Sequence, residues 1–161
     1  MAIRKIIELG RQDEALHAHA RPVEAFDKDL AALLNDLGDT MLEGNGAGLA
    51  APQVGVLKRC CVIDVGEGLI ELVNPEIVSS EGQMTVIEAC LSVPGRAGRV
   101  VRPEKVTVHA QDRRGEPFEI HGEGMLAVCL CHEIDHLDGI VYVDRMIEDC
   151  TEELKQKGVM Q

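Results

Sequence analysis

The sequence predicts an α+β fold in which antiparallel β-sheets pack around a central α-helix. Three observations predict it: one amphipathic helical segment, a series of short strand-like runs separated by turn residues, and a second helical segment that is apolar on nearly every face. A helix that is hydrophobic all round is normally buried. Strands joined by short turns form hairpins rather than β-α-β units, so the helices should combine with antiparallel sheet.

The elements follow in order along the chain. Residues 23–43 carry Leu and Met at helical spacing, and Gly44-Asn45-Gly46 ends that helix. Strand-like runs separated by turns rich in Gly, Asp and Ser follow at 59–65, 69–78, 84–91, 100–101, 105–111 and 117–121. The apolar helix is expected from about 124 to 137, and a last short helix near 149–157. No repeat or linker interrupts residues 1–161, so we expect a single domain.

Composition excludes several classes of function. The net charge of −12 argues against nucleic acid as a partner, because phosphate binding needs clustered Lys and Arg. No stretch approaches the length of a membrane span, and the amino terminus lacks the apolar core of a signal peptide. The expected compartment is therefore the cytoplasm. Its reducing conditions favour free thiols, so most of the six cysteines are interpreted as small buried hydrophobes.

The most informative segment is His132-Glu133-Ile134-Asp135-His136, inside the apolar helix. Positions i and i+4 of a helix lie on one face, so both imidazoles can reach one metal ion. Glu133 places a carboxylate beside that ion without having to be a ligand. In this H-E-x-x-H arrangement the metal activates water and the glutamate moves the proton. The central helix of the predicted fold is therefore a metal-binding helix.

Two further segments accompany the histidine helix: residues 46–53 (GAGLAAPQ) and residues 88–92 (EACLS). The three segments together resemble the signature motifs of the peptide deformylase family, which read G-x-G-L-A-A-x-Q, E-G-C-L-S and Q-H-E-x-D-H. They occur in the family's order, and the resemblance covers residues from about 3 to 148. Two positions depart from the pattern, Ala89 in place of glycine and Cys131 in place of glutamine. Neither replaces a ligand or the proton carrier, so we expect activity to survive.

The resemblance implies the ligands and the catalytic groups. Cys90 joins His132 and His136 in a Cys/His/His set, and three protein ligands leave a fourth position open for water. The implied metal is Fe²⁺, and Zn²⁺ or Ni²⁺ can occupy such a site. Glu133 is implied as general base and then general acid. The side-chain amide of Gln53 and the backbone N–H of Leu91 are implied as donors to the developing oxyanion.

A peptide-binding surface is expected beside these groups. The missing side chain at Gly48 lets a peptide backbone approach closely and pair with Gly48 and the Cys90 segment like an added strand. An apolar pocket for a methionine side chain is assigned to Ala47, Met125, Val128 and Cys129. Plain core packing is the alternative for each of these four residues.

The implied activity is hydrolysis of the N-formyl group from the N-terminal formylmethionine of newly synthesised polypeptides, with metal-bound water as the nucleophile and formate as a product. Some relatives contact the ribosome transiently through a basic carboxy-terminal helix. The short tail after Met146 is acidic, so a ribosome contact has weak support here. Asp135 is interpreted as structural, either orienting an imidazole or pairing with a base such as Arg102. Arg96 and Arg99 are interpreted as solvated surface charge, with contact to the substrate backbone as the alternative.

Two rival functions stay open on the sequence. A metallopeptidase of the general H-E-x-x-H type would cut internal peptide bonds and would take a third ligand downstream, where Glu148 and Glu152 are the candidates. A deformylase-like binding protein that has lost catalysis is the other. All the implied ligands and Glu133 are present, so the sequence offers that second rival little support.

Overall fold

Turns divide the middle of the chain into two antiparallel sheets. The computed structural model describes residues 2–158. The larger sheet has five strands in the order β1 (Gly48–Ala50), β2 (Cys60–Ile63), β3 (Ile70–Glu81), β6 (Lys105–Gln111) and β7 (Pro117–Glu123). The smaller sheet has three strands in the order β4 (Met84–Cys90), β5 (Val93–Arg102) and β8 (Glu148–Asp149). β1 and β4 are therefore edge strands of their sheets, with backbone groups free of a neighbouring strand on one side.

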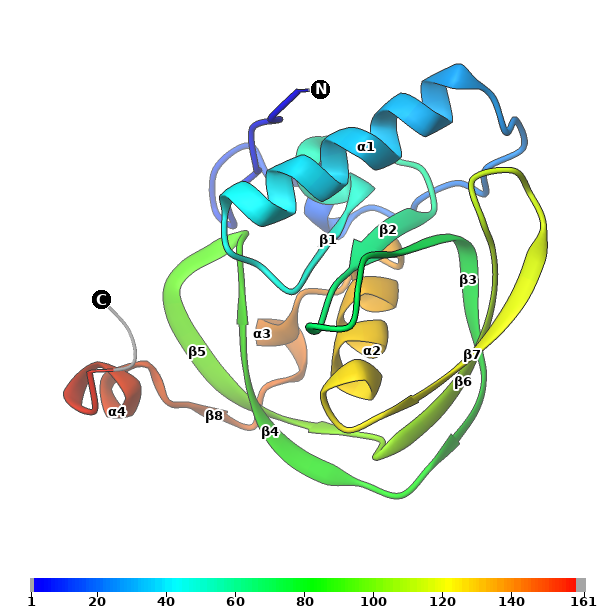
Figure 1. The fold of residues 1–161 in the computed structure, drawn as a ribbon. Coiled ribbons are helices and arrows are strands. Elements are labelled where there is room, and N and C mark those ends of the chain that lie inside the picture. Colours follow the sequence, from blue (N-terminus) through cyan, green and yellow to red (C-terminus); the bar gives the residue numbers. More distant parts are fainter. Residues whose placement is uncertain (1, 159–161) are drawn as a thin grey trace.

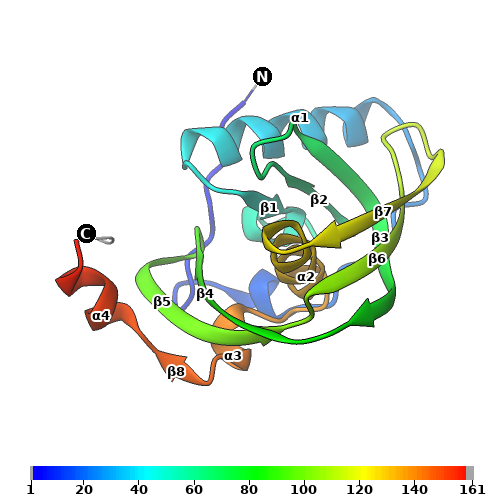
Figure 2. The same ribbon diagram turned by 60° about the horizontal axis from the view of Figure 1, so that its bottom comes forward.

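Helix α2 (Met125–Leu137) passes between the two sheets. Figure 2 views it nearly end-on, with the strands of both sheets wrapped around it. Every residue from 127 to 137 is buried. The helix packs through Ala127, Leu130 and Leu137 against the face of the larger sheet that carries Cys61, Leu72 and Val108 in one hydrophobic cluster. The predicted central helix is confirmed.

Helix α1 (Lys28–Glu43) covers the opposite face of β1 and β2 (Figure 1). Its buried leucines share a second cluster with Cys60 and Val62, whereas Cys61 belongs to the cluster around α2. Neighbouring residues of a strand point to opposite faces, so the two adjacent cysteines serve two different cores. All six cysteines are free thiols, as expected.

The remaining elements are short. They comprise two 3-10 helices, η1 (Glu14–His17) and η2 (Ala51–Val54), and the helices α3 (Tyr142–Arg145) and α4 (Thr151–Gln156). α3 and α4 pack on the smaller sheet, and η1 shares a third cluster with β5 and α3. Within residues 2–158, no helix combines the length and the hydrophobicity needed to cross a membrane.

Several predicted boundaries were wrong. The first helix begins at Lys28 rather than residue 23, because the side chain of Asp27 accepts a hydrogen bond from Leu30 N and caps the helix there. β3 continues to Glu81, beyond the predicted end at residue 78, and β7 continues to Glu123. The largest error concerns β5, predicted as residues 100–101 but extending over Val93–Arg102. The last helix is shorter than predicted.

Candidate metal centre

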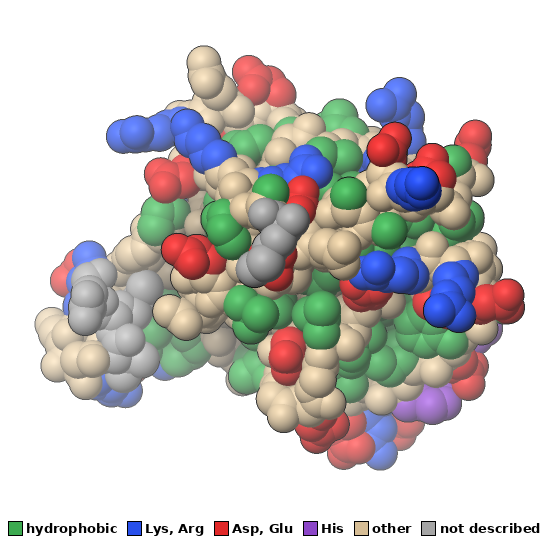
Figure 3. Space-filling model, turned by 45° about the horizontal axis from the view of Figure 1, so that its top comes forward, with side chains coloured by type: hydrophobic (Ala, Val, Ile, Leu, Met, Phe, Trp, Pro, Cys, Tyr) green, Lys and Arg blue, Asp and Glu red, His purple; other side chains and the backbone are tan. Residues whose placement is uncertain are grey.

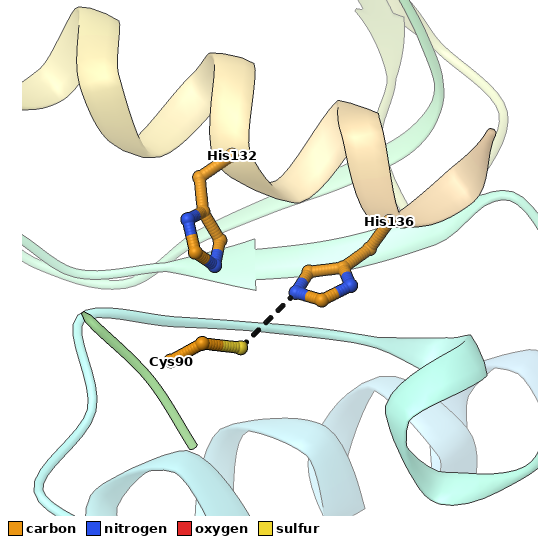
Figure 4. A group of neighbouring side chains, drawn as sticks. All are labelled: Cys90, His132 and His136. Carbon is orange, nitrogen blue, oxygen red and sulfur yellow. Dashed lines mark hydrogen bonds between the residues drawn. The ribbon is translucent and has the colours of Figure 1, made fainter. Parts of the chain in front are cut away.

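Three side chains converge at the centre of the fold (Figure 4). Cys90, His132 and His136 each offer one ligand atom, and these three atoms all lie within 4.8 Å of one another. Cys90 Sγ is 3.3 Å from His136 Nε2, and the two imidazole centroids are 5.0 Å apart. The residues come from two different elements, since the histidines lie one turn apart on α2 and the cysteine ends β4.

A register shift in the smaller sheet precedes the cysteine. Glu88 pairs with Gly98, but Cys90 pairs with Val93, so the regular β4–β5 pairing breaks between Glu88 and Cys90. Such irregularities often change the direction of a side chain next to an active site. The break falls on Ala89, whose φ is not positive. Alanine therefore replaces the family's usual glycine without backbone strain.

The donor set fits a divalent transition metal. One thiolate and two imidazoles are ligands that Zn²⁺ and Fe²⁺ accept, and three protein ligands leave an open position. Burial lowers the pKa of His136, so its imidazole is neutral, which is the form that binds metal. Burial also lowers the pKa of His132, but the nearby Glu133, Cys90 and Glu88 outweigh it and raise that pKa. These anionic surroundings favour a positive charge at this point.

A buried chain of ion pairs fixes the orientation of His132. The Nδ1 of His132 lies 2.7 Å from Glu88 Oε1, which leaves Nε2 for the metal. Arg102 donates to both oxygens of Glu88, at 2.6 and 2.9 Å, and to Asp135 Oδ2 at 2.8 Å. Asp135 also accepts two hydrogen bonds from Arg145, at 2.7 and 3.0 Å. The predicted pairing of Asp135 with Arg102 is confirmed.

Charge compensation keeps the side chains of this ion-pair network ionised. Burial alone would raise the pKa of Glu88, but hydrogen bonds from Arg102 and His132 outweigh it and lower the pKa to about 2. Both partners of the Arg102–Glu88 pair are nearly inaccessible, with side-chain exposures of 4% and 3%. Removal of either partner would therefore leave the other as an uncompensated charge in the protein interior.

Glu133 is buried beside the three donors. Its Oε1 has no hydrogen-bond partner among the described residues, and its Oε2 is 4.0 Å from His132 Nε2. Burial raises the pKa of Glu133 to about 7. A carboxylate with a pKa near neutrality can both accept and release a proton, which suits general acid–base chemistry.

The amide of Gln53 also reaches this centre. Its Oε1 accepts from Ala50 N at 2.9 Å, which fixes the amide so that Nε2 points away from β1. Nε2 donates to Ser92 Oγ at 3.1 Å and lies 3.5 Å from Cys90 Sγ. Gln53 was predicted from the sequence, whereas Ser92, which accepts this hydrogen bond from 39 residues away, was not.

A cleft of about 370 Å³ opens beside the donors. It is lined by three groups of residues, taken from the loop before β1 and its first residue, from β4 and the hairpin into β5, and from α2: Asn45, Gly46, Ala47, Gly48, Ile87, Glu88, Ala89, Cys90, Leu91, Val93, Pro94, Gly95, Arg96, Met125, Val128, Cys129, His132 and Glu133. The cleft thus brings together Ala47, Gly48, Leu91 and the three predicted pocket residues of α2. Met125 is 64% exposed and lies at the rim, whereas Val128 and Cys129 are buried.

Cys131, the second departure from the family motifs, lies outside the cleft lining. It is 5% exposed, and burial raises its pKa to about 11. The thiol is therefore protonated at neutral pH, where it is a poor nucleophile. We expect Cys131 to act as a packing residue that leaves the donor set undisturbed.

The metallopeptidase alternative lacks its third ligand. Glu148 is an exposed residue of β8 that accepts a hydrogen bond from Arg99 at 2.6 Å, and Glu152 is exposed on α4. Among residues 2–158, only Cys90, His132 and His136 form a cluster of three or more potential metal ligands. The third donor is thus an upstream thiol and not a downstream carboxylate.

Comparison with known proteins agrees with this geometry. Residues 3–152 match the family model described as polypeptide deformylase. The chain belongs to the peptide deformylase family. A peptide deformylase from Caldicellulosiruptor bescii is 58% identical over 153 residues, covering 95% of this chain and 91% of the relative. One from Acetivibrio thermocellus is 55% identical over 147 residues, covering 91% and 85%.

Solved structures of the family share the fold. A peptide deformylase from Legionella pneumophila aligns with a TM-score of 0.87 at 52% identity, covering 98% of this chain and 94% of that one. A peptide deformylase from Synechococcus elongatus, solved in complex with actinonin, aligns with a TM-score of 0.87 at 36% identity, covering 98% and 90%. The family consists of metal-dependent hydrolases that remove the N-formyl group from nascent peptides, and the Cys/His/His cluster is the candidate metal site of this member.

Replacement of Gly48 by alanine should impair activity. A Cβ at this position would lie 2.5 Å from Glu133 Oε2 and 2.8 Å from Glu133 Cδ, so the carboxylate would have to move. Displacement of a catalytic group by about 1 Å can lower the rate about 10²-fold. We expect kcat/KM on a formylated peptide to fall by about 10- to 100-fold, with unchanged metal content.

The matched control is Gly38→Ala on α1. Its Cβ would meet only the end of the Leu69 side chain, at 3.3 Å, far along the chain from the donors. Alanine also favours the helical conformation over glycine, by up to about 1 kcal/mol of folding free energy. This variant should keep the parental kcat/KM, and equal activity of the two variants would contradict the role given to Gly48.

Proposed function

We propose that this chain hydrolyses the N-formyl group of N-terminal formylmethionine on newly synthesised polypeptides and releases formate. The observation that carries the proposal is the convergence of Cys90, His132 and His136 beside a cleft that the buried Glu133 also lines. Membership of the peptide deformylase family supports the same reaction. A divalent cation held by the three side chains would supply a water of lowered pKa and polarise the formyl oxygen.

Glu133 carries the proton in this proposal. Its unpartnered Oε1 accepts a proton from the attacking water and then returns it to the departing amine nitrogen. One C–N bond breaks and one C–O bond forms, so formylmethionine and water give methionine and formate. The pKa of about 7 allows the same carboxyl group to serve in both directions at neutral pH.

Two donors stabilise the negative charge that develops on the formyl oxygen. Gln53 Nε2, 3.5 Å from Cys90 Sγ, is the side-chain donor, and the backbone N–H of Leu91 is the second. One such donor is typically worth about 3 kcal/mol of transition-state stabilisation. Leu91 directly follows Cys90 in the chain, and Gln53 Nε2 lies beside the Cys90 thiol, which supports this pair of donors.

The peptide lies between two strand edges. β1 and β4 are both edge strands, and Gly48 and the residues before Cys90 line the cleft between them. An extended chain placed there gains backbone hydrogen bonds from either side. Ala47, Val128 and Cys129, with Met125 at the rim, receive the methionine side chain.

The metal is Fe²⁺ in this proposal, with Zn²⁺ and Ni²⁺ as alternatives that the same donor set accepts. The thiolate of Cys90 makes the centre sensitive to oxidation. Protein isolated without oxygen should therefore contain iron, and exposure to air should lower both its iron content and its activity.

Residues 1–161 act as one catalytic domain located in the cytoplasm, where nascent chains appear. No direct contact with nucleic acid or membrane is proposed. A transient contact with the ribosome has little support, because the tail after Met146 is acidic and its Glu148 and Glu153 pair with Arg99 of the same molecule.

The test is a comparison of peptides with metal-loaded protein under anaerobic conditions. Formyl-Met-Ala-Ser, its unformylated form, and a longer formylated peptide are incubated with Ni²⁺- or Fe²⁺-loaded protein, and formate and peptide masses are measured. The proposal expects one formate per formylated peptide and no internal cleavage. Cleavage of internal bonds would support a metallopeptidase, and binding without turnover would support a protein that has lost catalysis.

A further inference from the structure

The cleft offers one accessible positive charge. Of its described lining residues, Arg96 is the sole Lys or Arg. The two acidic lining residues, Glu88 and Glu133, are buried, and Glu88 is committed to Arg102. A ligand in the open part of the cleft therefore meets a cation on a molecule whose net charge is −12. On the face shown in Figure 3, acidic and basic side chains are interspersed, so Arg96 is distinguished by its place in the cleft.

The backbone that carries Arg96 is firmly held. Ala97 N donates to Thr151 Oγ1 at 3.1 Å, and Cys150 N donates to Ala97 O at 3.0 Å. These bonds join the middle of β5 to the segment between β8 and α4, and these elements lie beside β5 in Figures 1 and 2. The next arginine, Arg99, is paired with Glu148 and Glu153 at 2.6 and 2.9 Å.

The side chain of Arg96, in contrast, is loosely held. Its Nη2 is 3.4 Å from Asp149 Oδ2, and the two side chains are 43% and 47% exposed. Such exposed pairs contribute at most about 1 kcal/mol and exchange readily with another anion. The guanidinium is therefore available to a carboxylate entering the cleft, with Asp149 as its competitor.

We propose that Arg96 is a specificity residue that favours substrates with an acidic side chain at the second or third position of the formylated peptide. The inference rests on the proposed function. With the formyl group at Cys90, the residues that follow the methionine would lie along the part of the cleft lined by Pro94, Gly95 and Arg96. An extended peptide advances about 3.3 Å per residue, so these two residues traverse the cleft after the methionine. The alternative is that Arg96 is solvated surface charge, as the sequence suggests.

The experiment measures kcat/KM for amidated formyl-Met tetrapeptides that carry Glu, Gln or Lys at the second or third position. Amidation removes the terminal carboxylate, so only side-chain charge differs. The wild type should prefer Glu over Gln by about two- to five-fold at one of the positions, the range that an exposed ion pair supports. The preference should shrink in high salt.

Variants identify the residue responsible. Arg96→Ala should abolish the Glu/Gln ratio, and Arg96→Glu should shift the preference to Lys. Asp149→Asn removes the competitor and should raise the ratio. The matched control is Arg99→Ala, which removes an equal charge from the same strand but outside the cleft lining, and it should keep the wild-type ratio.

The outcomes separate this inference from the function on which it rests. Equal kcat/KM for Glu, Gln and Lys peptides in the wild type, with formate released from all, would overturn the role of Arg96 and leave deformylation standing. A Glu preference that persists in Arg96→Ala would also overturn it. Absence of formate from every peptide would overturn the proposed function and this inference together.

Discussion

Replacement of Glu133 by alanine is expected to lower kcat on a formylated peptide by about 10²–10⁴-fold, the usual contribution of a positioned acid–base group. The variant should still bind one metal ion, because Glu133 is not one of the three converging donors. The measurement is formate release at saturating substrate, together with metal content by elemental analysis. Loss of activity with metal retained is the specific result, since a folding defect would remove both.

Glu152→Ala is the control for that experiment. Glu152 is an exposed glutamate on α4 and one of the two candidates, with Glu148, for the third ligand of a metallopeptidase. Its replacement should leave both formate release and metal content at the parental level. Robust turnover by metal-loaded Glu133→Ala protein would refute the proton-transfer role. Loss of metal in Glu152→Ala would instead support Glu152 as a metal ligand.

Replacement of Arg102 by leucine is expected to lower the free energy of unfolding by about 3–5 kcal/mol. Arg102 is 4% exposed and compensates two buried carboxylates, Glu88 and Asp135, so its loss leaves Glu88 buried and without its arginine partner. Glu88 in turn orients His132, and loss of such support typically weakens metal binding by about 10–100-fold. Urea unfolding of the metal-free protein and a Zn²⁺ competition titration measure the two effects separately.

Arg113→Leu provides the comparison. Arg113 also binds a glutamate through two hydrogen bonds, to Glu71 at 2.9 and 2.7 Å, but its side chain is 36% exposed. An exposed pair of this kind contributes about 1 kcal/mol or less. A loss of stability as large in Arg113→Leu as in Arg102→Leu would contradict the importance assigned to burial. If Arg102→Leu does not fold, Glu88→Gln tests the orientation of His132 through metal affinity alone.

Much of the site could be predicted from the sequence because many of its residues lie close together in short sequence patterns. The i, i+4 spacing of His132 and His136 needs only a helix, and the apolar residues around them predict that helix. The Cys90 segment could be joined to them only through the family motifs. No spacing rule predicts that a strand end 46 residues upstream will lie 3.3 Å from the His136 imidazole.

The site residues that the sequence did not predict contact partners far away along the chain. Glu88 contacts His132 across 44 residues, and Ser92 holds Gln53 across 39. Each lies within a recognised motif, yet nothing in its neighbours specifies its partner. Asp135 and Arg102 were anticipated as a pair because a buried carboxylate needs a base, but the participation of Arg145 was not.

The fold errors have a similar origin. β5 was reduced to two residues because Pro94, Gly95 and Gly98 interrupt the pattern that marks a strand. Its pairing with β4 and β8 supplies the hydrogen bonds that hold these poor strand formers extended. The first helix was extended too far because apolar spacing continues upstream of Asp27, where the cap sets the true start.

We expect one thiolate and two imidazoles to hold a single cation with one position left open. This coordination can be measured by X-ray absorption of the Zn²⁺-loaded protein. The spectrum should show one sulfur at about 2.3 Å, two nitrogens at about 2.0–2.1 Å and one further light atom, and the sulfur should be lost in Cys90→Ser. A coordination shell without sulfur, or one unchanged by Cys90→Ser, would rule out Cys90 as a metal ligand.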